Sequence, residues 1–281
     1  MLLGTLEIGY ASSNCTVKKT AAHNLSACAD FVEIPVHDNF RPGIDRLFIA
    51  DNYEGFITLH GEGETDGLRR IRFSCPDRQG RVKYTKQVIK LFNYAMKAAG
   101  TVLVQAAIIH PDTMRRGMSR TSQIEWLAES LMQLSSGCNI PEICIEPRGG
   151  DRQRKVVRSH IQDVLLLSEM LHDVTKISYC IDLAQTYCAY GLHGVLEMID
   201  QCLTNDISIR ELHASDVIAT KRSKRLGMEI GTGEIDFSEI MGKIQGMHCR
   251  LLIETLGGFP VFSRSLAYLT QVEVKRNAVL L

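Results

Sequence analysis

The chain has little of several features that mark common classes of protein. Its 32 basic and 32 acidic residues give zero formal net charge, so no overall field would draw it onto nucleic acid. Aromatic residues make up only 6% of its 281 residues, which leaves few platforms for stacking a base. No apolar run reaches the ~20 residues that a membrane-spanning helix needs. Glu7 interrupts the N-terminal apolar stretch too early for a signal peptide. We therefore expect a cytoplasmic protein with no membrane partner.

The chain also lacks paired-cysteine motifs and internal boundaries. None of its nine cysteines forms a CxxC motif, and most lie inside apolar runs, as Cys144 and Cys180 do. This placement is typical of reduced, buried cysteine in an intracellular protein. No linker, repeat or low-complexity segment divides the chain, so we expect one domain over residues 1–281.

Strand-like and helix-like stretches alternate along the chain. Helical spacing of apolar residues is clearest in residues 84–99, which Gly100 follows as a typical helix C-cap. Further helices are expected at residues 16–28, 122–134, 156–171, 192–202, 237–244 and 261–269. Strands are expected at residues 3–10, 31–36, 56–60, 102–110, 142–146, 177–182, 207–213 and 250–254. Eight strands with helices between them predict an α/β fold, a closed parallel (β/α)8 TIM barrel.

Six of these strands end abruptly in a residue of a type that binds metals. The six residues are His60, His110, Glu146, Asp182, His213 and Glu254. Functional side chains of a (β/α)8 barrel lie at the C-terminal ends of its strands, so these six should converge at one mouth. Imidazole nitrogen and carboxylate oxygen suit Zn, Mn or Fe, and a cation removes the repulsion between crowded carboxylates. The pattern predicts a metal centre, with a salt-bridged polar mouth as the alternative.

The residues around these strand ends resemble the endonuclease IV family (family 2 apurinic endonucleases) among the xylose-isomerase-like barrels. The resemblance rests on the segments IIHPD at His110, ICIEP at Glu146, CIDLAQTYCAYG at Asp182, LHASD at His213, EIGTGEI from Glu229 and LLIET at Glu254. It implies that His60, His110 and Glu146 bind one metal ion. Glu146 would bridge to a second ion, held also by Asp182, His213 and Glu254.

The ligands of the family's third metal ion are absent from this chain. The resemblance places them at Gln185, Arg225 and Gly227, so it implies two divalent ions, Zn or Mn, with Gln185 beside their ligands. Asp216, three residues after His213, could hold that imidazole in place or cap the following loop. Both interpretations of Asp216 stay open.

Two clusters of basic residues follow strands and belong to the same face of the predicted barrel. One comprises Arg69, Arg70 and Arg72, and the other comprises Lys221, Arg222, Lys224 and Arg225. Arg225 stands where the resemblance places the third ion, so its guanidinium could grip a phosphate there. The clusters could contact a phosphate-bearing substrate, DNA among them, or could simply be solvated. Tyr84 and Tyr187 are the candidates for stacking near the mouth.

These features predict a metal-dependent hydrolase of phosphate esters, similar to endonuclease IV, with DNA or an abasic site as substrate and a role in DNA repair. A hydroxide between two ions would attack phosphorus, with Glu146 positioning both ions and Arg225 serving the leaving oxygen.

The alternative is a sugar or sugar-phosphate isomerase or epimerase. A single metal ion would then be held by Glu146, Asp182, His213 and Glu254, and the two glutamates would also transfer protons across an enediolate. His60 and His110 favour the hydrolase, because a one-metal isomerase does not need both. Other metal chemistry and a non-catalytic binding module are the remaining candidates.

Overall fold

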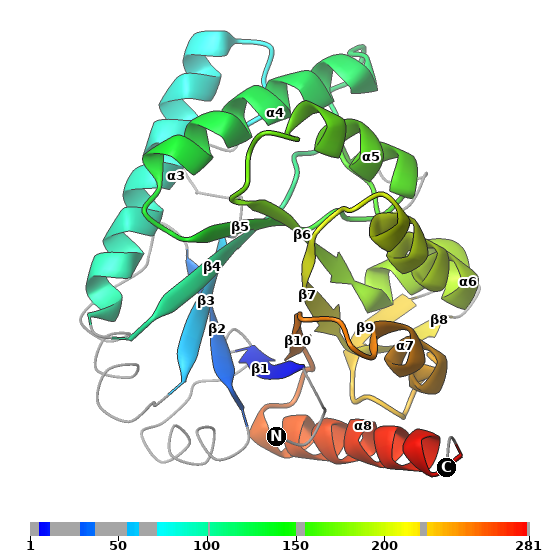
Figure 1. Cartoon of the computed structure of the whole chain (residues 1–281). Coiled ribbons are helices and arrows are strands. Elements are labelled where there is room, and N and C mark those ends of the chain that lie inside the picture. The colour runs from blue at the N-terminus through cyan, green and yellow to red at the C-terminus, as the bar shows by residue number, and fades with distance from the viewer. Residues whose placement is uncertain are drawn as a thin grey trace.

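A closed ring of eight parallel strands forms the centre of the structure (Figure 1). The computed structural model describes residues 6–11, 29–36, 55–61, 72–100, 102–149, 155–219 and 224–279. The barrel strands are β1 (Glu7–Ala11), β2 (Phe31–Val36), β3 (Phe56–Gly61), β4 (Val104–Ile109), β5 (Glu142–Ile145), β6 (Ile177–Asp182), β7 (Ile209–Ala214) and β10 (Arg250–Ile253). They pair in the order β1-β10-β7-β6-β5-β4-β3-β2 and close on β1. This confirms the predicted (β/α)8 barrel.

The described helices surround the strands (Figure 1). They are α3 (Arg78–Ala99), α4 (Arg120–Gly137), α5 (Ile161–Met170), α6 (Leu183–Thr204), α7 (Phe237–Ile244) and α8 (Phe259–Val279). Ser119 caps α4 by accepting a hydrogen bond from the Ser122 N–H, and Gly100 ends α3 at a φ of 67°. No helix among the described residues is both long enough and apolar enough to cross a membrane. The helix predicted at residues 16–28 lies outside the described residues.

Helix α6 begins earlier than its apolar spacing predicts. Gly191 interrupts it with a non-helical conformation at a φ of 71°, so two helical segments follow one another. The spacing detected only the second segment, which lies at residues 192–202, because the first segment starts directly at the strand end. This direct start places Asp182 at the N-cap of α6.

The interior of the barrel is apolar on part of its circumference and polar elsewhere. Phe31 and Phe56 stack with ring centroids 5.2 Å apart, and they share a buried cluster with Leu252. A Cβ atom at Gly9 would overlap the Phe31 ring, so a glycine is required on β1 for the phenylalanine to fit. A second small cluster comprises Ala106, Ile108, Cys144 and Cys180, and other buried strand positions carry the histidine, glutamate and arginine side chains of the network described below.

An antiparallel hairpin of β8 (Asp216–Ala219) and β9 (Lys224–Met228) follows β7. The sequence predicted only a polar stretch there. Asp216 begins β8, and its carboxylate accepts hydrogen bonds from four backbone N–H groups, those of Val217, Gly231, Gly233 and Ile235. A Cβ at Gly233 would overlap the Asp216 carboxylate, which explains the glycine. Asp216 therefore acts as a loop anchor, the second of its two predicted roles.

Candidate metal centre

Two histidines and one glutamate meet at the C-terminal end of the barrel. His60 is the penultimate residue of β3, while His110 and Glu146 directly follow β4 and β5. His60 Nε2 lies 2.7 Å from His110 Nε2 and 3.4 Å from Glu146 Oε2. His110 Nε2 lies 2.8 Å from the same carboxylate oxygen. The structure thus brings together the three residues predicted to bind one ion.

The other predicted ligands surround Glu146 from the opposite side. His213 Nδ1 lies 3.5 Å from Glu254 Oε2 and 3.7 Å from Glu146 Oε2. Burial, with the charges of Glu146 and Glu254, raises the pKa of Asp182 to about 7. Three carboxylates therefore crowd one another beside His213. Asp182 uses one oxygen to cap α6, accepting a hydrogen bond from the Gln185 N–H at 2.9 Å.

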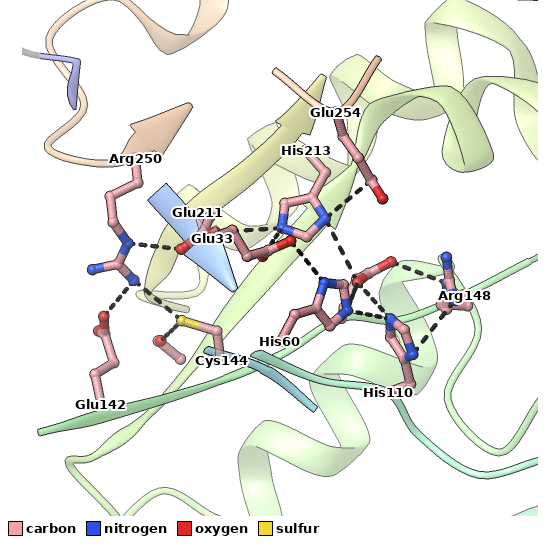
Figure 2. A network of polar contacts seen from close by, with 12 residues as sticks. Glu33, His60, His110, Glu142, Cys144, Arg148, Glu211, His213, Arg250 and Glu254 are labelled. Atoms are coloured by element: carbon pink, nitrogen blue, oxygen red, sulfur yellow. Dashed lines mark hydrogen bonds and ion pairs between the residues drawn. The ribbon is translucent and has the colours of Figure 1, made fainter. Parts of the chain in front are cut away.

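Glu33 on β2 is a member of the centre that sequence reasoning missed. Its Oε1 lies 2.9 Å from His60 Nδ1 and its Oε2 lies 3.4 Å from His213 Nε2, so it bridges the two imidazoles (Figure 2). Burial alone would raise the pKa of Glu33, but His60 and His213 lower it to about 2. The available signal was a lone charge inside the apolar run FVEIPV, which a buried strand tolerates only when the charge is paired.

A buried ion network lies deeper in the barrel and supports His213. Arg250 donates from Nε to Glu211 Oε2 and from Nη2 to Glu142 Oε2, both at 2.7 Å. Glu211 Oε1 in turn lies 3.3 Å from His213 Nε2. Figure 2 shows this chain of contacts extending from Arg250 to the mouth. Because side chains alternate along a strand, the spacing of Glu211 and His213 by two already placed them on one face.

Among the described residues, the cation that meets Glu146 and His110 is Arg148 rather than Arg225. Arg148 Nε lies 3.0 Å from Glu146 Oε1 and its Nη1 lies 3.4 Å from His110 Nδ1. Burial alone would lower the pKa of Arg148, but Glu146, Asp182 and Glu254 raise it. Arg225 is exposed on β9, where it pairs with Ile218. The prediction chose Arg225 from its position relative to the glycine turn, and the hairpin turns that residue toward solvent.

Most of the other residues predicted to contact a substrate lie outside the described residues. Arg69, Arg70, Lys221 and Arg222 lie outside the described residues, and only the backbone of Lys224 is described, paired with Ala219. Tyr84 is buried edge-on against Phe73, so it cannot stack on a ligand. Tyr187 is half-buried and donates its hydroxyl to the Glu234 carbonyl at 3.2 Å. Tyr84 is therefore excluded as a stacking platform, while the hydroxyl of Tyr187 is held at the Glu234 carbonyl.

The donor set fits a divalent cation. Within the described chain, four buried atoms of the centre lack a hydrogen-bond partner, namely Glu33 Oε2, Glu146 Oε1, Arg148 Nε and His213 Nδ1. Buried polar atoms normally have such a partner, but each of these atoms takes part in an ion pair instead. The ligand position is indicated by side chains whose ligand atoms lie close together. The residue groups whose ligand atoms lie within 4.8 Å of one another are Glu33–His60–His213, His60–His110–Glu146 and Glu146–Cys180–His213. Nitrogen and oxygen ligands of this kind suit Zn, Mn or Fe.

Comparison with known proteins identifies the fold but no sequence family. No family model and no curated protein matches the chain. A D-tagatose 3-epimerase-like protein matches with a TM-score of 0.74 and 17% identity, covering 98% of this chain and 100% of that one. D-psicose 3-epimerase from Clostridium cellulolyticum H10 matches with a TM-score of 0.69 and 13% identity, over 98% and 99% of the chains. A fusion of a xylose isomerase-like TIM barrel with 4-hydroxyphenylpyruvate dioxygenase gives a TM-score of 0.68 and 16% identity, over 97% and 44%.

The chain has the xylose-isomerase-like TIM barrel fold. The comparison contradicts the predicted phosphate-ester hydrolase, because similar structures are named as sugar epimerases, L-ribulose 3-epimerase among them. The endonuclease IV-like assignment, its DNA substrate and its role in DNA repair therefore lose their support. The physical reason is that histidines and carboxylates at strand ends mark a metal-binding barrel mouth, whichever reaction takes place there.

Proposed function

We propose that this protein is a divalent-metal-dependent isomerase or epimerase acting on a ketose sugar or a ketose phosphate. The observation that carries the proposal is the placement of two carboxylates beside one imidazole. His213 Nδ1 lies 3.7 Å from Glu146 Oε2 and 3.5 Å from Glu254 Oε2 at the barrel mouth. Such a pair provides two proton-transfer groups around one substrate position. Matching structures named as ketose 3-epimerases support this chemistry.

The ion would be held by residues from four different strand ends, namely Glu146, Asp182, His213 and Glu254. When bound, it would polarise the substrate carbonyl and so acidify the neighbouring C–H group. Asp182 can contribute without releasing its helix, because the N-cap hydrogen bond uses only one carboxylate oxygen. Glu211 would fix the ring of His213 from behind through its contact with Nε2 at 3.3 Å, as carboxylates behind metal-ligating histidines commonly do.

Glu146 and Glu254 are the proposed proton-transfer residues. Epimerisation beside a carbonyl requires one group to remove a proton from one face and another to return a proton to the opposite face. Burial alone would raise the pKa of Glu146, but His110 and Arg148 lower it well below its usual range, so its carboxylate is ionised. Glu254 is 29% exposed and can exchange its proton with water between turnovers.

The proposal also concerns how many ions the centre binds. Catalysis as described requires one ion. The second predicted position, among His60, His110 and Glu146, has ligand atoms within 4.8 Å of one another. Glu33 lies behind His60 there, as Glu211 lies behind His213. The donors of this position fit a cation, and Arg148 lies beside two of them.

The test is solvent-hydrogen exchange into the substrate. Metal-free protein is reloaded with Mn²⁺, Co²⁺ or Zn²⁺ and incubated in D₂O with a panel of ketoses and ketose phosphates, and proton NMR follows loss of the C–H signal beside the carbonyl. We expect metal-dependent exchange that Glu146→Gln and Glu254→Gln each abolish. Glu234→Gln, an exposed glutamate in the Glu229–Ile235 turn, should exchange as the native protein does.

Two results would decide against the proposal. One is the absence of exchange with every substrate although the metal is bound. The other is exchange that survives both glutamine substitutions. Faster exchange with a phosphorylated ketose than with the free sugar would support a phosphate-bearing substrate and the predicted contacts from the basic loops.

A further inference from the structure

Arg148 occupies the edge of the position that a second ion would fill. It follows Glu146 by two residues, and its side chain is 29% exposed. Its guanidinium lies 3.0 Å from Glu146 Oε1 and 3.4 Å from His110 Nδ1. It therefore contacts two of the three residues in the group His60–His110–Glu146 (Figure 2).

The contact between Arg148 and Glu146 is an ion pair without hydrogen-bond geometry. The ion pair is short, yet Arg148 Nε and Glu146 Oε1 both lack hydrogen-bond geometry. A planar guanidinium usually meets a carboxylate through paired hydrogen bonds. Here it provides a permanent positive charge at the outer oxygen of Glu146, while the inner oxygen, Oε2, faces both imidazoles.

This charge opposes a second divalent ion. An ion held by His60 Nε2, His110 Nε2 and Glu146 Oε2 would lie within a few ångströms of the guanidinium, and like charges at that distance repel strongly in a buried site. The guanidinium also neutralises part of the charge that Glu146 would offer the ion. Arg148 also interacts with Asp182 and Glu254 through space, but its direct contacts are with Glu146 and His110. Its repulsion is therefore strongest at the position of the second ion.

We propose that Arg148 sets the metal stoichiometry of the centre at one ion. It takes the place of a second cation beside Glu146 and keeps the position at His60, His110 and Glu146 weak. The ion at Glu146, Asp182, His213 and Glu254 then binds alone. This inference rests on the proposed function for that ion, and it explains how a set of ligands sufficient for two ions can serve one-ion chemistry.

The experiment measures metal content and magnetic coupling, independently of activity. Metal-free native protein and Arg148→Met are dialysed against graded Mn²⁺, and bound metal is counted by mass spectrometry. We expect one tight equivalent in the native protein and two in Arg148→Met, with the second site at least about tenfold tighter than in the native protein. The electron paramagnetic resonance spectrum of Arg148→Met should show two coupled Mn²⁺ ions sharing Glu146.

Three further variants make the result specific. Arg116→Met removes an exposed arginine from the loop after β4, and it should keep one equivalent and an uncoupled spectrum. Adding His110→Ala to Arg148→Met should remove the second equivalent and keep the first. Arg148→Gln repeats the test with a polar side chain if the methionine variant folds poorly.

The two proposals fail in different ways. One equivalent in both native protein and Arg148→Met, with deuterium exchange intact, would overturn the role of Arg148 and leave the proposed function standing. Two tight, coupled ions in the native protein would also overturn it. No tight equivalent in either protein would overturn both proposals.

Discussion

The buried network around Arg250 gives a quantitative test of the interior of the barrel. Arg250 begins β10 with only 6% of its surface exposed. It donates to Glu211 and Glu142 at 2.7 Å each and lies 3.3 Å from the Cys144 sulfur. Burial alone would lower the pKa of Arg250, but Glu211 and its neighbours raise it. Replacing Arg250 by methionine preserves much of the apolar stem and removes the charge.

The expected loss comes mainly from the carboxylate left behind. Glu211 is fully buried, and removing one partner of a buried ion pair costs about 3–5 kcal/mol because the other charge remains uncompensated. For a chain of this size each kcal/mol corresponds to roughly 2 °C, so the Tm should fall by ~6–10 °C. Adding Glu211→Gln to Arg250→Met should recover part of this loss, since the stranded charge is then removed.

Thermal and urea unfolding of the metal-free protein, followed by circular dichroism, measure the effect. Arg264→Met is the control, because Arg264 forms an ion pair with Glu229 on the surface, where its side chain is 57% exposed; its Tm should not change measurably. A loss below about 1 kcal/mol for Arg250→Met, as for a surface pair, would refute the reasoning. So would a double variant that is less stable than Arg250→Met.

Three further predictions concern the metal centre. Glu211→Gln should weaken metal affinity about 10–100-fold by loosening His213, measured by competition with a chelator; unchanged affinity would contradict this role. The second prediction concerns the ion pair of His60 with Glu33. Burial alone would lower the pKa of His60, but Glu33 raises it to about 10. Stability from this pair is full below about pH 6.5 and is lost as pH rises through the folded pKa. The Tm of metal-free protein should therefore fall from pH 7 to 10, and His60→Gln should flatten that fall. Asp182→Asn keeps the N-cap and removes a carboxylate that Glu146 and Glu254 repel. At pH 8 it should raise the Tm of the metal-free protein and weaken metal binding. A lower Tm would contradict the repulsion among the three carboxylates.

The sequence by itself determined the barrel and the direction in which six of its side chains meet. Each strand is a short apolar run, because both faces of a parallel barrel strand are buried. Each of six runs ends in histidine or a carboxylate, and parallel strands bring their C-terminal ends to one mouth. These two facts depend only on order along the chain. They suffice to place His60, His110, Glu146 and His213 within a few ångströms of one another, although their role as metal ligands remains a proposal.

Only the tertiary structure decided which neighbours those side chains have. Glu33 meets His60 and His213, and Arg250 meets Glu142 at a separation of 108 residues, because these contacts depend on strand register and on which side chains point inward. The same holds for Arg148, which meets Glu146 and His110, whereas Arg225 lies exposed on β9. The short motifs at the strand ends could not choose between a nuclease and an epimerase. They specify that histidines and carboxylates gather at one mouth, which many different reactions can use.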